Sequence, residues 1–295
     1  MKRHPVLVGT IVIGIVLIVF FLSVYAVTYF KGRDMTFVIG EKIGVVTIQG
    51  VIRDSKVTID ELLKFKKDKS VKAIVLRIDS PGGAIGPTQE IYEEVKKIRD
   101  KKNVLVSLGS VAASGGYYIA CAGNRIIANP GTITGSIGVI IEFANVEELM
   151  KKIGFQSVTI KSGEYKDVMS PFRSMTDEER TILQEVINSV HNQFIEAVAK
   201  GRNLKREDVV KIADGRIFSG EQAKALGLVD ALGNLQDTIS MAADIAGVKG
   251  EPNVIYPPRK RISLLDFLLQ GIATRFINYL EDKSYEFSYL FMPNR

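Results

Sequence analysis

The 295-residue chain contains one cysteine and two histidines, and this scarcity excludes several common kinds of site. A lone cysteine, Cys121, forms no disulfide within the chain and no cysteine-rich metal site, so we expect a small buried residue there. His4 precedes a long apolar run, and His191 lies inside a predicted helix. Neither histidine is well placed to face a nucleophile, so a Ser-His-Asp hydrolase is not indicated.

Motifs for metal, nucleotide and nucleic-acid binding are also missing. The chain has no His-Glu-x-x-His zinc motif and no Gly-x-x-x-x-Gly-Lys-Ser/Thr phosphate loop. The net charge is +6, but the basic residues are interleaved with acidic ones, apart from a short patch at 259–261. We therefore expect no metal and no nucleic-acid partner.

Residues 6–30 carry no charged side chain. A helix of this length exceeds the roughly 30 Å hydrocarbon core of a bilayer, so we predict an uncleaved transmembrane anchor. The alternative is a cleaved secretory signal, because Val24-Tyr25-Ala26 weakly resembles a cleavage site. Basic residues on the two flanks are nearly balanced, so charge leaves the orientation of the anchor open.

After a short polar joint, runs of Val, Ile and Leu alternate with stretches of helical spacing. This alternation predicts βαβ units and a mainly parallel sheet, which is an α/β fold. We expect strands at 43–48, 71–78, 104–107, 125–128, 136–141 and 157–160, and helices at 59–67, 87–101, 147–153, 176–200, 207–212 and 221–226.

The domain organisation predicted from these patterns is simple. Residues 1–36 form the anchor and joint, 37–250 one catalytic-size domain, and 251–295 a C-terminal tail. Within the tail, Ile262–Leu280 is apolar but too often interrupted to span a bilayer. It predicts an amphipathic helix that packs on its own domain, on a neighbouring subunit or on the membrane surface.

A serine in a small-residue segment is the first candidate for chemistry. Ser114 lies between a predicted strand and a predicted helix, among alanines and glycines. Small neighbours let a substrate backbone approach, and the N–H of Gly115 at the helix start can stabilise an oxyanion. A serine that merely caps the helix explains this segment equally well.

A glycine-rich loop is the second candidate. The segment 79–83, Asp-Ser-Pro-Gly-Gly, follows a predicted strand at the end where parallel sheets bind ligands. Its Gly83 can supply a second oxyanion donor, although the segment also suits an ordinary turn.

The third candidate is a lysine in the segment 161–172. A lysine acts as a general base only when neutral, so burial must lower its ordinary pKa of about 10.4. Tyr165, Met169 and Phe172 could form an apolar wall around Lys166. On this segment alone, a solvated surface lysine is the simpler interpretation.

Together these segments resemble the signal peptide peptidase A family of Ser-Lys serine proteases, in its short, single-copy, membrane-anchored type. The resemblance runs from about Ile43 to Leu232, with agreement in order and spacing. Further matching segments are 113–117, 129–138, 163–166 with 170–172, and 218–230.

The resemblance implies a ClpP/crotonase-like spiral of βαβ units and assigns the site. Ser114 would be the nucleophile, Lys166 the base, and Ser136 the residue that orients the lysine amine. The backbone N–H groups of Gly83 and Gly115 would form the oxyanion hole, and no cofactor is needed.

The resemblance also implies a biological role. It is that of a single-pass enzyme of the cell membrane, with an extracytoplasmic catalytic domain and a homo-oligomeric ring, that degrades cleaved hydrophobic signal peptides. Three alternatives stay open: a quality-control or stomatin-type membrane peptidase, a crotonase-like acyl-CoA enzyme, and a non-catalytic ring scaffold.

Overall fold

The computed structural model describes residues 13–23 and 41–258, and the backbone of 288–290. The chain divides after Gly40 into two units, which are described separately. In the first unit, residues 13–23 are helical, and the rest of the predicted anchor lies outside the described residues. No helix within the described ranges is long and apolar enough to cross a membrane. The predicted helix Ile262–Leu280 also lies outside them.

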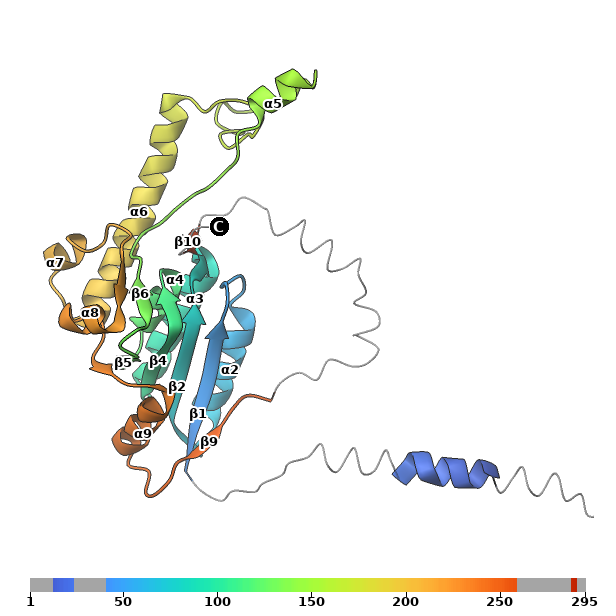
Figure 1. Ribbon diagram of the computed structural model, residues 1–295, viewed down its shortest axis with the longest axis vertical. Coiled ribbons are helices and arrows are strands. Elements are labelled where there is room, and N and C mark those ends of the chain that lie inside the picture. The colour runs from blue at the N-terminus through green and yellow to red at the C-terminus, as the bar shows by residue number, and fades with distance from the viewer. Residues whose placement is uncertain (1–12, 24–40, 259–287, 291–295) are drawn as a thin grey trace, which may run out of the picture. The chain divides into compact units, whose positions relative to one another are not determined.

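A mainly parallel sheet forms the centre of the second unit (Figure 1). Its main path runs in the order β7-β6-β4-β2-β1-β9, and β5 pairs with β4 and β8. Strands β6 and β7 are antiparallel, and the other pairs of this sheet are parallel. Its strands are β1 (Lys42–Gln49), β2 (Val71–Ser80), β4 (Val104–Ala113), β5 (Arg125–Ala128), β6 (Ile133–Gly135), β7 (Ile217–Ser219), β8 (Ala231–Leu232) and β9 (Asn253–Ile255).

A second, two-stranded sheet pairs β3 (Gly82–Ala84) with β10 (Ser288–Leu290). The helices are α2 (Lys56–Lys67), α3 (Ile85–Arg99), α4 (Gly115–Ala120), α5 (Glu147–Lys152), α6 (Asp177–Arg202), α7 (Arg206–Val210), α8 (Gly220–Ala225) and α9 (Leu235–Ala246).

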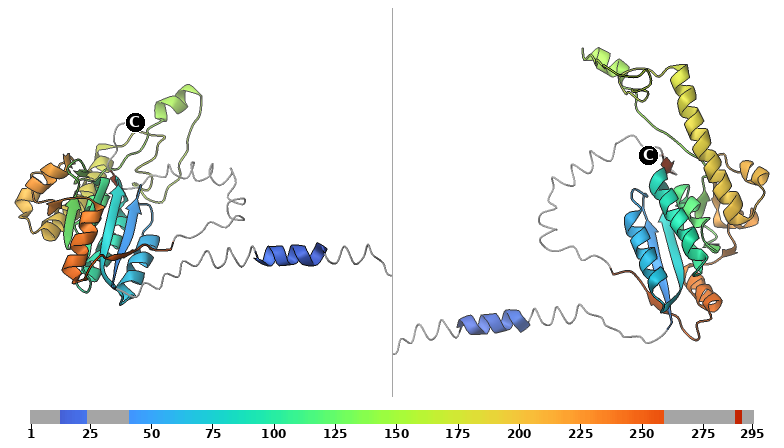
Figure 2. Two further views of the ribbon diagram at one scale, coloured as in Figure 1. Left: turned by 60° about the horizontal axis from the view of Figure 1, so that its bottom comes forward. Right: turned by 180° about the vertical axis from the view of Figure 1, so that it is seen from behind.

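Helices cover both faces of the main sheet, so its central strands are buried on both sides. Alternate residues of β1 divide between two apolar clusters: Val46 packs with α2, α3 and α4, whereas Val45 packs with α9. Figures 1 and 2 show α2 and α3 on one face and α9 on the other. Because both faces of these strands are buried, their sequences are continuous apolar runs. The arrangement confirms the predicted α/β class.

Two predicted strands are wrong. Strand β6 ends at Gly135, and Gly135 and Ser136 both have positive φ (80° and 49°), which turns the chain out of the sheet. Residues 157–160 form no strand, and Ile160 is 98% exposed. Apolar β-branched residues outside a sheet mislead a prediction that assumes burial.

The other predicted elements are present with shifted ends, whereas β7, β8, α9 and β9 were not predicted. Strand β4 continues to Ala113, well past the expected end at 107. The capping box that begins α6 is present, because the Thr176 side chain accepts from the Glu179 N–H and the Glu179 carboxylate accepts from the Thr176 N–H. Cys121 is buried, as predicted.

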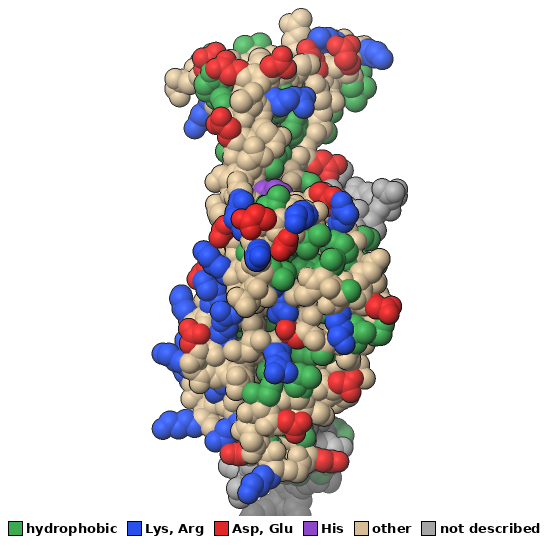
Figure 3. Space-filling view, turned by 90° about the vertical axis from the view of Figure 1, so that its left-hand side faces the viewer, with side chains coloured by type: hydrophobic (Ala, Val, Ile, Leu, Met, Phe, Trp, Pro, Cys, Tyr) green, Lys and Arg blue, Asp and Glu red, His purple; other side chains and the backbone are tan. Residues whose placement is uncertain are grey.

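Residues 141–176, which we call the arm, extend away from the sheet together with the first half of α6 (Figure 1). Helix α6 packs on the core mainly through its second half, where Phe194 and Val198 are fully buried. The arm is held by its own contacts: Val146 N donates to Pro171 O (2.7 Å), and the Phe155 and Phe172 rings lie 5.9 Å apart. Figure 3 shows it as a projection that carries both apolar and charged side chains.

Candidate active site

Ser114 occupies a strained turn between β4 and α4. Its φ of 52° and ψ of −118° lie outside the regions that non-glycine residues favour. Such strain is characteristic of functional turns that the surrounding fold holds in place. The Ser114 side chain makes no capping hydrogen bond to α4. The alternative interpretation of this serine as a helix cap therefore loses its support.

Ser136 leaves the sheet directly beside Ser114. Ala113 and Gly135, the residues that precede the two serines, are paired in parallel strands, and Ser114 N donates to Gly135 O (2.8 Å). Ser136 N in turn donates to Arg216 O (2.8 Å). Both serines are buried, with exposed fractions of 1% and 8%. The structure thus brings together two residues that the sequence places 22 positions apart (136 minus 114).

Gly83 presents its backbone N–H and C=O to the edge of β3 that faces away from Ile52. Ile52 N donates to Gly82 O and Ala84 N donates to Ile52 O, each at 2.8 Å. Because neighbouring residues of a strand point their N–H and C=O groups to opposite sides, those of Gly83 face the other edge. On that edge β10 pairs antiparallel, with Tyr289 opposite Gly83.

The Gly83 segment and the Ser114 turn belong to one site. Ser80, at the end of β2, is paired with Ala112 of β4, and its Oγ accepts from Gly82 N (3.1 Å). A Cβ on Gly116 would lie 2.9 Å from Ser80 O, so the start of α4 packs directly on the turn into β3. The first N–H groups of a helix have no partner inside it, which leaves that of Gly115 available beside this edge.

Lys166 lies in the arm, which extends away from β4 and α4, the two elements that flank Ser114 (Figure 1). Its side chain is exposed, and its amine makes no hydrogen bond or ion pair within the described part of the chain. The expected apolar wall does not enclose it, because Tyr165 and Phe172 are 38% and 40% exposed. The arm extends away from the core, and none of the described elements buries this lysine.

A charge network beside Lys166 was missed by the sequence reasoning. Arg173 donates to Asp167 (Nη2–Oδ1 2.8 Å) and to Glu179 (Nη1–Oε2 2.8 Å), and Lys161 Nζ lies 2.6 Å from Asp167 Oδ1. Hydrogen bonds from Arg173 lower the pKa of Glu179 to about 2, and those from Arg173 and Lys161 hold that of Asp167 well below its usual range. The signal was available, because charges of alternating sign recur every six residues at 161, 167, 173 and 179.

A neighbouring hydrogen bond engages another carboxylate at the start of α6. Tyr165 donates its hydroxyl to Glu178 Oε1 (2.6 Å). This bond is the main reason that the pKa of Tyr165 is raised to about 12. Tyr165 therefore serves as a hydrogen-bond donor, in addition to any apolar contact of its ring.

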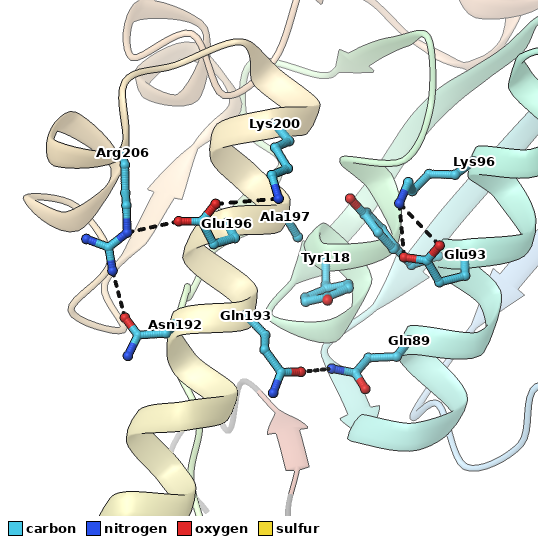
Figure 4. Close-up of a pocket in the computed structure, with 11 residues that line it drawn as sticks. Gln89, Glu93, Lys96, Tyr118, Asn192, Gln193, Glu196, Ala197, Lys200 and Arg206 are labelled. Atoms are coloured by element: carbon cyan, nitrogen blue, oxygen red, sulfur yellow. Dashed lines mark hydrogen bonds and ion pairs between the residues drawn. The ribbon is translucent and has the colours of Figure 1, made fainter.

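A hollow of about 490 Å³ between α3 and α6 lies apart from these residues (Figure 4). Its polar groups are largely paired with one another: Gln89 with Gln193 at 2.9 Å, Lys96 with Glu93 at 3.0 Å, and Arg206 with Glu196 at 2.9 Å. None of the predicted catalytic residues lines this hollow. Among the described residues, no cluster of His, Cys, Asp or Glu could hold a metal ion.

Comparison with protein families gives two matches. Residues 96–249 match the model of peptidase family S49, which is more than half of the chain. Residues 38–132 match the model of Clp protease. The second match agrees with the α/β architecture described above, which is ClpP-like.

Individual proteins are similar to this chain over most of its length. A protein of Synechocystis sp. that bears a protease name, slr0021, is 43% identical over 240 residues, covering 79% of this chain and 87% of the relative. An Enterococcus faecium protein named for signal peptide peptidase SppA is 42% identical over 180 residues, covering 61% and 52%. The chloroplast serine protease SPPA of Arabidopsis thaliana is 33% identical over 221 residues, covering 74% and 33%.

The chain therefore spans about half of the Enterococcus protein and a third of the Arabidopsis protein, but most of the Synechocystis one. A family match over more than half of the sequence and a relative that shares 43% of its residues lead to the same conclusion. This chain belongs to peptidase family S49 and is a serine peptidase of the SppA type.

Proposed function

We propose that this peptidase is a membrane-bound endopeptidase that degrades cleaved signal peptides, with Ser114 as nucleophile and Lys166 as general base. The observation that carries the proposal is the buried pair of Ser114 and Ser136 beside the edge of β3 at Gly83. A strained, uncapped serine next to the backbone N–H groups of Gly83 and Gly115 is an arrangement that suits acyl transfer.

The proposed reaction uses one lysine twice. Neutral Lys166 accepts the proton of Ser114 as Oγ attacks the scissile carbonyl, and the N–H groups of Gly83 and Gly115 stabilise the oxyanion. Protonated Lys166 then donates its proton to the leaving amine, and afterwards activates the water that hydrolyses the acyl-enzyme. Ser136 holds the lysine amine in position by a hydrogen bond.

The lysine in this proposal comes from a neighbouring subunit of a homo-oligomeric ring. The arm that contains Lys166 extends away from β4 and α4 of its own chain, which supports a site shared between chains. The arm also exposes apolar side chains, with Val158 at 85% and Ile160 at 98%. Such exposure is typical of a surface that another protein copy covers.

The substrate is proposed to bind as an added strand on β3. The antiparallel pairing of β10 with β3 supports this mode, because the edge at Gly83 accepts an extended backbone. Signal peptides are suggested by the name of the Enterococcus relative. The apolar residues 6–30 would anchor the enzyme in the cell membrane, with its catalytic domain outside the cytoplasm.

The dyad is tested by mixing two inactive variants of the full chain in detergent. Ser114→Ala and Lys166→Ala should each abolish peptide hydrolysis, because each removes one half of the dyad. After subunit exchange in equal amounts, a shared site should regain about a quarter of wild-type activity, because chance pairs an intact serine with an intact lysine at that frequency. A mixture of Ser114→Ala with the double variant should stay inactive.

Three outcomes would contradict parts of the proposal. Full activity in Lys166→Ala would exclude the lysine base, and no recovery in exchanged mixtures would place both residues of the dyad in one chain. The substrate class is tested in membranes that lack the protein. If signal-peptide fragments fail to accumulate there while fragments of membrane proteins do, the enzyme serves membrane-protein quality control instead.

A further inference from the structure

Lys166 stands between Tyr165 and Asp167, whose side chains contact Glu178 and Arg173, and its own amine makes no hydrogen bond or ion pair within the described residues. Asp167 is its sequence neighbour, and Glu178 and Glu179 begin the adjoining helix α6. A carboxylate within about 4–6 Å of a lysine stabilises the protonated amine, which is the inactive form of a general base.

Each of the three carboxylates is already engaged by another donor. Arg173 contacts both Asp167 and Glu179, and Lys161 contacts Asp167. Glu179 also accepts from the backbone N–H of Thr176 (2.9 Å). The hydroxyl of Tyr165 donates to Glu178.

The other charged groups of the arm leave this arrangement intact. On α5, Glu147 lies 2.9 Å from Lys151 Nζ and accepts from Ser174 Oγ, and Glu148 is 3.1 Å from the same Lys151. On α6, Asp177 and Arg180 are exposed to solvent. Glu164 is exposed as well, and only its backbone carbonyl is engaged, by Lys161 Nζ (2.6 Å). Exposed charges interact weakly because water and salt screen them.

We propose that Arg173, assisted by Lys161 and Tyr165, is a positioning residue that holds the carboxylates of the arm away from Lys166, so that the lysine stays free to act as a base. This inference rests on the proposed role of Lys166. Arginine suits the task because its planar guanidinium contacts two carboxylates at once and stays charged at any working pH. The ion pair between Arg173 and Glu179 is strengthened by partial burial, since the side chain of Glu179 is only 4% exposed.

The role predicts a defined change in the pH profile of the full-length enzyme. In Arg173→Gln, Asp167 and Glu179 lose their arginine partner and can pair with Lys166, which favours the protonated amine. The acidic limb of the pH profile of kcat/KM should therefore move to higher pH by about one unit. Activity should recover toward the wild-type level once the pH is high enough to deprotonate the amine. Tyr165→Phe, which releases Glu178 alone, should produce a smaller movement in the same direction.

Matched variants separate this role from simple support of the loop. Arg173→Lys keeps a cation and should keep the limb near its wild-type position. The double variant Arg173→Gln/Asp167→Asn lacks one of the freed carboxylates, so its acidic limb should lie closer to the wild-type pH than that of Arg173→Gln. Lys151→Gln removes a cation of the same arm that does not contact Asp167, and should leave the profile unchanged.

An Arg173→Gln enzyme whose activity is lowered equally at every pH would overturn the proposal, because that result describes a merely structural contact. Failure of the lysine base itself gives a different result. In that case wild type would show no acidic limb, or Lys166→Ala would remain active. The two failures are therefore distinguishable in one set of measurements.

Discussion

At the residue scale, the need for glycine at position 83 is a matter of space. A Cβ built there would lie 2.1 Å from the carbonyl oxygen of Ile52, which bridges β3 from the far side. Since that oxygen belongs to the backbone, it cannot move aside as a flexible side chain would. Either β3 or the segment at Ile52 must shift, and with it the N–H that we assign to the oxyanion hole.

We therefore expect Gly83→Ala to destabilise the protein by about 1–3 kcal/mol and to lower kcat strongly. Thermal unfolding and peptide hydrolysis measure the two effects. Gly86→Ala is the matched control, because nothing lies within 4 Å of a Cβ at that helical position. The control should be neutral or slightly stabilising. Wild-type stability and turnover in Gly83→Ala would contradict this account of the β3 edge.

At the element scale, β10 occupies the edge of β3 that a substrate strand would need. Its pairing places Tyr289 opposite Gly83, and β10 also lies close to α4, the helix that follows Ser114. Backbone pairing of this kind does not depend on side-chain identity, so a bound peptide and β10 would compete for the same groups.

Deletion of residues 286–295 should therefore lower KM for peptide substrates while leaving kcat nearly unchanged. Steady-state hydrolysis with a peptide series measures the change. Deletion of 291–295 alone retains β10 and serves as the control, for which we expect wild-type KM. An unchanged KM in the longer deletion would mean that β10 does not compete with substrate.

At the scale of the whole molecule, the arm has the character of an assembly surface. Val158 and Ile160 are the most exposed large apolar residues of the arm, and they lie within a few residues of Lys166. If a second copy covers them, a charge placed there would have to be buried without a partner, which opposes assembly.

The double variant Val158→Glu/Ile160→Glu should consequently yield smaller particles in analytical ultracentrifugation, with loss of activity and unchanged circular dichroism. Val57→Glu on α2 is the control, since that side chain is 63% exposed and lies outside the arm. Its assembly and activity should match wild type. A double variant that keeps wild-type mass would remove the arm from the subunit interface.

The sequence by itself determined what depends on local pattern. Apolar runs and helical spacing identified strands such as β1 and β2 and the α/β class, because double-sided burial leaves a periodic signature. The capping box of α6 was readable because it joins residues three positions apart. Small residues marked the segments of Ser114 and Gly83 as turns at strand ends, and only the family resemblance gave them a catalytic role.

Only the tertiary structure decided how these segments meet. Ser114 and Ser136 lie side by side because β4 and β6 pair at Ala113 and Gly135, a register that no local pattern encodes. Tertiary contacts between segments far apart in the sequence likewise decide the pairing of β10 with β3. They also decide the direction in which the arm with Lys166 extends. Contacts between residues far apart in the chain place Ser114 beside Ser136, whereas the side chain of Lys166 is exposed on the arm.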